Sequence, residues 1–342
     1  MNGRRFAMLF MAALLCTLAL AGCGEKTIRG EVMEVNTDGQ LSFVLDQEVG
    51  GPITIQTDED TYIFSWIDEA PESDFREGNV EGMMVQVTLK KFRKEKIASQ
   101  VLIEQRKIRD YYTLADGTKV DLTIGMNEHG YSIPNVTELL QVRDPIGPEN
   151  VQVVGQESLR DLPEEAQQNI MAYYEAQGLF YDEFQTLEDA YHAFCTWDKF
   201  YAFYLSQEIM PVASSDDVMY ILTDFMSDRG MEGTDELRLC AAFDKKTGEN
   251  IPITDIFTCE PQEIITKLIE ICDLGKDDPI EEMKAAFKPE YVVIFPENLE
   301  ITFPEEVLPE YGMDFGMGID LDNEALLELI HPWAVPNKEA TS

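Results

Sequence analysis

Residues 83–90, Met83-Met84-Val85-Gln86-Val87-Thr88-Leu89-Lys90, place an apolar side chain at every second position. Because successive side chains of a β-strand point to opposite faces, this alternation predicts a strand with one buried face. Shorter runs with the same period surround it in the first third of the chain: residues 28–32, 41–45, 53–55, 62–66 and 101–103. Five or six such strands within about 80 residues predict a small closed barrel of the oligonucleotide/oligosaccharide-binding (OB) type.

The rest of the chain mixes helical and strand patterns. Helices are predicted from Asp161 to Gly178, from about Thr186, from Pro261 to Leu274 and from Asn323 to Ile330. Alternating runs between them predict antiparallel strands, so the expected fold class is α+β. The expected organisation is a signal segment (1–22), a small antiparallel OB-like β-barrel (23–107), a connecting region (108–160), an α+β domain (161–332) and a loose tail (333–342).

The N-terminus has the three-part form of a bacterial lipoprotein signal. Arg4 and Arg5 precede an apolar segment, which ends in Leu20-Ala21-Gly22-Cys23. The apolar segment is short for a membrane span, and small residues precede the cysteine. We therefore predict lipidation of Cys23 and cleavage before it, with the chain anchored to membrane lipid on the extracytoplasmic face of a Gram-positive type of cell membrane. The alternative is an uncleaved anchor helix in which Cys23 has no role.

The charge is strongly negative and unevenly distributed. The chain has 26 Lys and Arg against 65 Asp and Glu, a net charge of −39. Residues 108–342 hold fourteen of the basic and forty-eight of the acidic residues, a net charge of −34. Such a surface repels nucleic acid, whose binding depends on neutralising phosphates. It attracts a cationic partner, although an acidic surface also serves solubility alone.

No pattern of catalytic or metal-binding residues stands out. His129, His192 and His331 have no metal-binding spacing, and residues 320–331 begin like a calcium loop but lack its Gly and closing Glu. Helix capping is the preferred interpretation of that segment. We therefore expect no catalytic residue, no metal and no cofactor. Four cysteines remain beyond the signal segment, for which free thiols are favoured over disulfides: Cys195, Cys240, Cys259 and Cys272.

Two clusters have both a structural and a functional interpretation. A basic hairpin, comprising Lys90, Lys91, Arg93, Lys94 and Lys96, is either a solvated tip or a contact for anionic lipids and wall polymers. An aromatic stretch is either core or the lining of a sugar groove: Phe194, Trp197, Phe200, Tyr201, Phe203 and Tyr204. The structural interpretation is preferred for both clusters.

Two segments in the C-terminal half carry a family resemblance. They are AFDKKTGENIPITDIF (242–257), and YVVIFPENLEITFP (291–304) followed by EVLPEYG (306–312). Together they resemble the extracellular domain of the lysozyme-sensing anti-sigma factor family, which also accompanies some polysaccharide deacetylases. The N-terminal half resembles small OB-like barrels of Gram-positive lipoproteins. The resemblance implies a non-catalytic module that binds a wall-associated ligand, in one case lysozyme.

The predicted function is therefore that of an envelope lipoprotein that binds or senses a ligand without transforming it. The expected ligand is a cationic protein such as a lysozyme, or a peptidoglycan glycan, and its contact residues stay open. Two alternatives remain: an accessory of an envelope polysaccharide hydrolase or deacetylase, and a scaffold subunit of an envelope complex.

Overall fold

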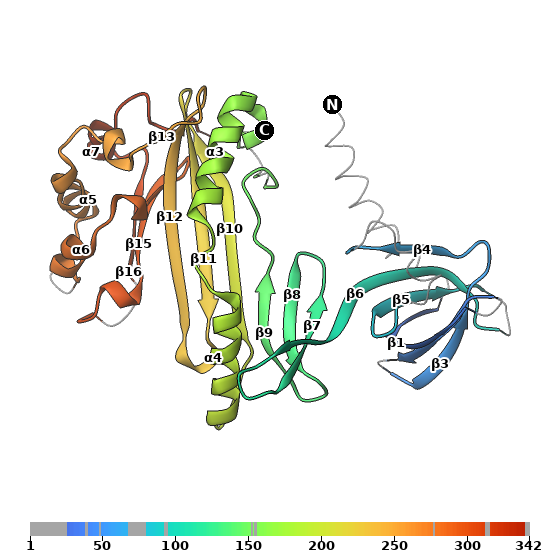
Figure 1. The fold of residues 1–342 in the computed structure, drawn as a ribbon. Coiled ribbons are helices and arrows are strands. Elements are labelled where there is room, and N and C mark those ends of the chain that lie inside the picture. The colour runs from blue at the N-terminus through green and yellow to red at the C-terminus, as the bar shows by residue number, and fades with distance from the viewer. Residues whose placement is uncertain are drawn as a thin grey trace. The chain divides into compact units, whose positions relative to one another are not determined.

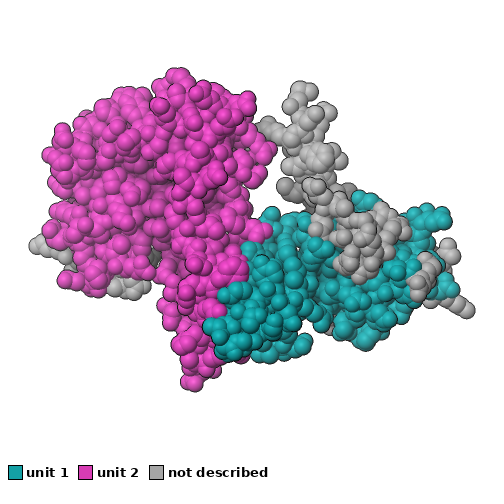
Figure 2. Space-filling model, viewed as in Figure 1, with its two compact units in different colours: residues 1–138 teal, residues 139–342 magenta. Residues whose placement is uncertain are grey.

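The computed structural model describes residues 26–37, 40–47, 49–67, 80–91, 95–151, 153, 156–275, 278–311 and 315–338. The predicted signal segment and Cys23 lie outside these residues. The chain divides into two compact units, residues 1–138 and residues 139–342, which we call the N-terminal and C-terminal units (Figure 2).

Strands make up the described part of the N-terminal unit. They are β1 (Thr27–Asn36), β2 (Ser42–Gln47), β3 (Gly51–Gln56), β4 (Tyr62–Ser65), β5 (Met84–Leu89), β6 (Ala98–Thr113), β7 (Lys119–Ile124) and β8 (Glu128–Ile133). Their order is β3-β2-β1-β5-β6-β7-β8, with β4 parallel to β6 and the remaining pairs antiparallel. The predicted alternation at residues 83–90 forms β5, where Val85 and Val87 are fully buried.

The expected small closed barrel at residues 23–107 is wrong. β6 has 16 residues; it pairs with β5 from Ala98 to Gln105 and with β7 from Arg106 to Thr113. The sheet therefore continues past β6 (Figure 1). Among the described residues, the end of β3 is linked toward β6 by one isolated bridge, from Gln56 to Ile97, the residue before β6. The α+β description is also corrected, since strand residues outnumber helical ones and the sheets are mixed. Alternation reports which side chains are buried and does not specify whether a sheet closes.

The C-terminal unit contains two sheets. The larger has the order β9-β10-β11-β12-β13: β9 (Thr137–Arg143), β10 (Phe203–Ser214), β11 (Val218–Asp228), β12 (Thr234–Asp244) and β13 (Asn250–Ile251). β9 pairs with β10 in parallel, through Leu140 to Val142, and the other neighbours are antiparallel. The smaller sheet has the order β14 (Val292–Ile294), β15 (Asn298–Phe303) and β16 (Phe315–Asp320).

Helices cover the strands of this unit. The α-helices are α3 (Glu164–Gln177), α4 (Glu183–Thr196), α5 (Ile264–Cys272), α6 (Ile280–Ala286) and α7 (Glu324–Leu329). Short 3-10 turns are η2 (Leu159–Asp161), η3 (Gly230–Glu232), η4 (Ile253–Ile256), η5 (Pro261–Glu263), η6 (Pro289–Tyr291) and η7 (Glu305–Val307). α3 and α4 run along the β10–β12 sheet, and β14–β16 with α5–α7 form a separate layer (Figure 1).

The alternation of side chains along β12 explains how its sheet is buried on both faces. Ala241 and Phe243 pack with Ala166 and Ile170 of α3. Cys240 and Ala242, on the opposite face, join the larger core that includes the strands β14–β16 and helix α5. Because adjacent residues of a strand alternate between faces, one strand contributes to two cores.

The helix ends follow local capping chemistry. α3 ends before Gly178, as predicted, with a positive φ of 69° at that glycine. α4 begins at Glu183, earlier than the predicted Thr186, because the Asp182 carboxylate accepts a hydrogen bond from the Gln185 backbone N–H at 3.1 Å.

Part of the expected loose tail is held in place. Ala334 is fully buried, and its carbonyl accepts a hydrogen bond from the Tyr220 hydroxyl at 2.5 Å. The Trp333 carbonyl accepts another from the Ser215 hydroxyl at 2.7 Å, and the Asn337 N–H donates to the Ser214 carbonyl at 2.8 Å. Residues 333–337 are therefore bound to the end of β10 and to β11.

Candidate functional site

Two hollows flank β12 in the C-terminal unit, and they form the candidate site. The helix-side hollow has a volume of about 440 Å³ and lies between α3, β12, the segment after β13, and η6. Several of its polar groups already have partners. The Thr223 hydroxyl lies 3.3 Å from Gln177 Oε1, and Asn250 Nδ2 donates to the Ala242 carbonyl at 3.1 Å. Ordinary packing and cross-strand contacts thus account for these groups, and they do not indicate a reactive centre.

The strand-side hollow has a volume of about 340 Å³ and is lined by Arg238 of β12 and by residues 295–298 and 300. Arg238 Nη1 donates to Glu300 Oε2 at 3.0 Å, and the guanidinium carbon lies 5.6 Å from the centre of the Phe295 ring. Its Nε atom is buried without a hydrogen bond among the described residues, 4.0 Å from Glu236 Oε1. Arg238 is thus held by Glu300 and Phe295 as a fixed wall of this hollow.

Burial affects the titratable groups beside these hollows. Asp224 lies directly opposite Arg238 across the β11–β12 pair. Desolvation raises the pKa of Asp224, and the Arg238 charge opposes that rise. Burial raises the pKa of the Cys240 thiol to about 12, so this thiol stays protonated and is a poor nucleophile near neutral pH.

Carboxylates dominate the exposed rim of β12 and its surroundings. Asp235 and Glu236 on β12, Glu290 on η6 and Glu297 before β15 are all exposed. Arg238 is the cation on this part of β12, and it is already paired with Glu300. The rim therefore carries a net negative charge, which fits the excess of acidic residues in this half of the chain.

The three histidines are on different elements. His129 lies in β8, with its ring 5.7 Å from that of Tyr131. His192 is an exposed residue of α4, and His331 stacks on Trp333 at 5.9 Å. Within the described part of the chain, no group of three or more His, Cys, Asp or Glu side chains is placed to hold a metal ion.

The calcium-like segment is a helix cap, as preferred. The Asn323 side chain accepts hydrogen bonds from the backbone N–H groups of Ala325 at 2.9 Å and Leu326 at 3.3 Å. These bonds satisfy the first donors of α7.

The four cysteines that follow the predicted signal segment are free thiols, as favoured. Cys240 is buried, Cys259 and Cys272 are half-buried, and Cys195 is exposed.

The aromatic stretch packs largely on itself. Phe203 is buried, and its ring lies 5.9 Å from that of Trp197 and 6.2 Å from that of Phe200. The Phe200 ring in turn lies 5.6 Å from that of Phe194. Tyr201 is the exposed member, with 57% of its surface accessible. This arrangement fits the preferred interpretation as packing.

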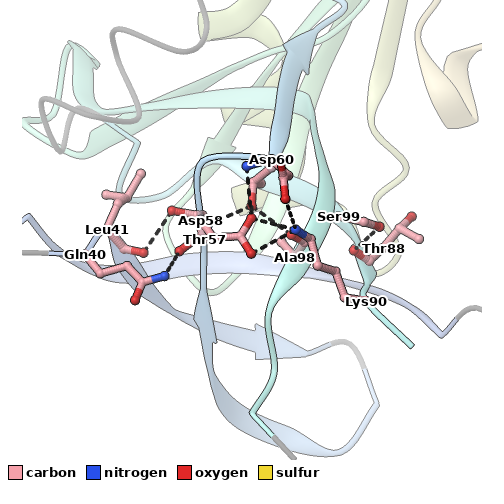
Figure 3. A network of polar contacts seen from close by, with 10 residues as sticks. Gln40, Leu41, Thr57, Asp58, Asp60, Thr88, Lys90, Ala98 and Ser99 are labelled. Atoms are coloured by element: carbon pink, nitrogen blue, oxygen red, sulfur yellow. Dashed lines mark hydrogen bonds and ion pairs between the residues drawn. The ribbon is translucent and has the colours of Figure 1, made fainter. Parts of the chain in front are cut away.

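The described part of the basic hairpin shows one lysine in an ion-pair network (Figure 3). Lys90 Nζ lies 2.7 Å and 2.8 Å from the two carboxylate oxygens of Asp58, and 3.5 Å from Asp60. The hydrogen bond from Lys90 lowers the pKa of Asp58, and the same bond raises the pKa of Lys90. Lys90 is therefore neutralised within the fold. Arg93 and Lys94 lie outside the described residues.

Sequence reasoning missed the group formed by Arg238, Glu300 and Phe295. These residues are separated by about sixty positions, and only the packing of β15 against β12 brings them together. The one available signal was an arginine within an alternating strand, which indicates a buried partner for its charge.

None of the described helices combines the length and apolar character that a membrane span requires. No protein-family model matches the chain, and no curated protein matches its sequence. Among solved structures, a DUF3298 family member from Bacteroides fragilis is similar at 9% identity with a TM-score of 0.35, covering 67% of this chain and 93% of its own. A DUF3298 family protein from Pseudomonas aeruginosa is similar at 12% identity with a TM-score of 0.32, covering 68% and 97%. These TM-scores are too low to carry an argument about fold or function.

Proposed function

We propose that this chain is a membrane-anchored envelope lipoprotein whose C-terminal unit binds a cationic protein without transforming it. The observation that carries the proposal is the concentration of negative charge: residues 139–342 have 12 Lys and Arg against 43 Asp and Glu, a net charge of −31, and exposed carboxylates line the rim of β12. Charge of this kind accelerates encounter with a cationic partner and favours the complex at low salt.

Two sequence features support the proposed setting. The predicted lipoprotein signal ending at Cys23 supports a position on the extracytoplasmic face of the membrane. The resemblance of residues 242–257 and 291–312 to the lysozyme-sensing anti-sigma factor family makes a lysozyme the natural first ligand to test. A recognition role also suits the surroundings of β12, where Cys240 is held protonated and Arg238 is paired.

The binding test is a calorimetric titration of the purified chain with lysozyme at low and high salt. We expect binding at about 20 mM salt that weakens at least tenfold near 0.5 M, because exposed charges are screened over a few ångströms at high ionic strength. An acidic protein of similar size is the control and is expected not to bind. Absence of binding to lysozyme at low salt would overturn the proposal.

The anchor is tested separately by mass spectrometry of the protein extracted from membranes. We expect a diacylglycerol adduct on Cys23 and loss of the preceding 22 residues. Cys23→Ser is expected to abolish the adduct and to release the protein from the membrane fraction. An unmodified Cys23 in an intact chain would contradict the anchor.

A further inference from the structure

The outer edge of β12 has no strand partner along most of its length, although η4 and η6 lie close to its C-terminal part. β12 pairs with β11 over every residue from Thr234 to Asp244. On its other side it pairs with β13 only at Ala242 and Phe243. From Thr234 to Ala241, no other strand of the described chain pairs with this edge. Unpaired backbone N–H and C=O groups on a sheet edge form a template for another strand.

The hydrogen bonds at the end of β12 show which residues point their backbone groups outward. The Lys245 N–H donates to Asp217, on the β11 side, at 2.9 Å. The Asp244 N–H donates to Glu249, on the β13 side, at 3.0 Å. Backbone groups alternate along a strand, and the β11–β12 register has no irregularity. The N–H and C=O groups of Glu236, Arg238 and Cys240 therefore point to the outer edge, where Glu236 is exposed, Arg238 is half-buried and Cys240 is buried.

The two hollows lie on opposite faces of this same edge. Leu239 and Ala241 line the helix-side hollow, and Arg238 lines the strand-side hollow. A strand added to β12 would direct its side chains alternately toward the two faces. Main-chain hydrogen bonds with pockets for alternate side chains are the two requirements of recognition by strand addition.

The charges at the edge select the occupant. Asp235, Glu236, Glu290 and Glu297 are exposed around it. A second copy of β12 would bring its own Asp235 and Glu236 toward these carboxylates, and like charges on neighbouring strands repel. A segment rich in Lys or Arg gains from the same carboxylates.

We propose that β12 binds an extended, cationic segment of a partner protein as an added strand. The segment bonds to the outward groups of Glu236 and Arg238, which lie on the accessible part of this edge, and directs alternate side chains toward the two hollows. This inference rests on the proposed function, because it names the binding mode for the cationic partner. In this binding mode, the exposed carboxylates around β12 select a basic segment over an acidic one.

The test compares two substitutions of the exposed Glu236. Glu236→Gln removes the charge and keeps the outward N–H. Glu236→Pro removes both, and it spares the bonds to β11 because this N–H points away from that strand. In titrations with lysozyme at low salt, we expect Glu236→Gln to weaken binding a few-fold and Glu236→Pro to weaken it at least tenfold more. Equal affinities of the two variants would overturn strand addition while leaving the proposed function standing.

Residue-resolved hydrogen exchange gives a second readout on the unmodified chain, which does not depend on the folding of the proline variant. On addition of lysozyme, the amides of Glu236 and Arg238 are expected to exchange at least tenfold more slowly. Those of Leu237 and Leu239, already bonded to β11, are expected to change little. Binding without this alternation would overturn the inference, and absence of any lysozyme binding would overturn both the inference and the proposed function.

Discussion

The outer edges of β3 and β12 are built in opposite ways. In β3, the outward position Pro52 has no N–H, and the outward N–H of Gln56 donates to the Lys96 carbonyl at 2.9 Å. β3 is also short, with six residues. β12 has 11 residues and no proline, and its outward groups are unpaired by any described strand from Thr234 to Ala241.

The difference shows that the two edges avoid unwanted pairing by different means. Short strands and proline are common means of preventing unwanted pairing at a sheet edge. β12 has neither of these features, and its protection comes from charge, through Asp235, Glu236 and Arg238. Charge rejects acidic and apolar strands but admits a basic one, so it is a selective form of protection.

The largest expected effect is on the unfolding free energy, when a glycine near each of the two edges is replaced by alanine. Gly248, in the turn after β12, has a φ of 71°, and a Cβ atom there would lie 2.3 Å from the Ala166 carbonyl oxygen. Gly51, at the start of β3, has a φ of 83° with no atom within 4 Å of such a Cβ. Gly248→Ala is expected to cost about 3 kcal/mol or more in unfolding free energy, because strain and overlap add. Gly51→Ala, which incurs only the backbone strain, is expected to cost about 1–2 kcal/mol.

Denaturant unfolding of both variants measures this difference. Equal losses of unfolding free energy in the two variants would show that the turn after β12 can move away from α3. That result would contradict the expected difference between the two glycines.

An intermediate effect is expected from restoring the missing donor of β3. Pro52→Thr gives this edge an outward N–H and is expected to increase self-association at high salt, where charge repulsion is screened. Loss of the proline ring is also expected to reduce the unfolding free energy by about 0.4–1 kcal/mol through the unfolded state. Light scattering and denaturant unfolding measure the two effects. Thr54→Ser, which leaves the backbone donors unchanged, is the control. An unchanged molar mass for Pro52→Thr would mean that proline does not protect this edge.

The smallest effects are expected on the melting temperature, when either of two carboxylates with pKa values shifted in opposite directions is replaced by an amide. The Lys90 hydrogen bond lowers the pKa of Asp58 in the fold, so the ionised carboxylate stabilises the protein above its unfolded pKa of about 3.9. That contribution is lost as the pH falls through the lowered folded value. Asp58→Asn is therefore expected to lower the melting temperature at pH 7 and to have little effect at pH 2.

Asp224 is expected to behave in the opposite sense. Desolvation raises its folded pKa, so ionisation opposes folding as the pH rises above about 3.9 and through the raised folded value. Asp224→Asn is expected to raise the melting temperature at pH 7 and to change it little at pH 3. Thermal melts of both variants across this pH range check the two signs. A lower melting temperature for Asp224→Asn at pH 7 would show that attraction to Arg238 outweighs desolvation.

Much of the local structure was predictable from the sequence. β5, the C-terminal end of α3 at Gly178 and the cap at Asn323 formed where apolar period, glycine and capping residues indicated. Each depends on neighbours within a few positions. The start of α4 was misplaced because Asp182 and Thr186 both have the chemistry of a cap residue, and only the backbone geometry chose Asp182.

The candidate site was hardly predictable. The negative charge of residues 108–342 was visible, and it indicated the chemistry of a partner. The sequence did not show that part of this charge lies at an unpaired strand edge. The alternating pattern of β12 does not indicate how many of its residues will pair with a neighbouring strand. β13 ends after two residues, and this short pairing decides the open edge.

The sequence by itself determined where many of the strands and helices form and where the negative charge is concentrated. Only the tertiary structure decided that β6 continues from β5 to β7 instead of completing a barrel, and that β12 keeps an unpaired edge between two hollows. The physical reason is that periodicity and capping act over a few neighbouring residues. Strand order, sheet closure and edge coverage depend on contacts between residues far apart in the chain, for which one sequence contains no local signal.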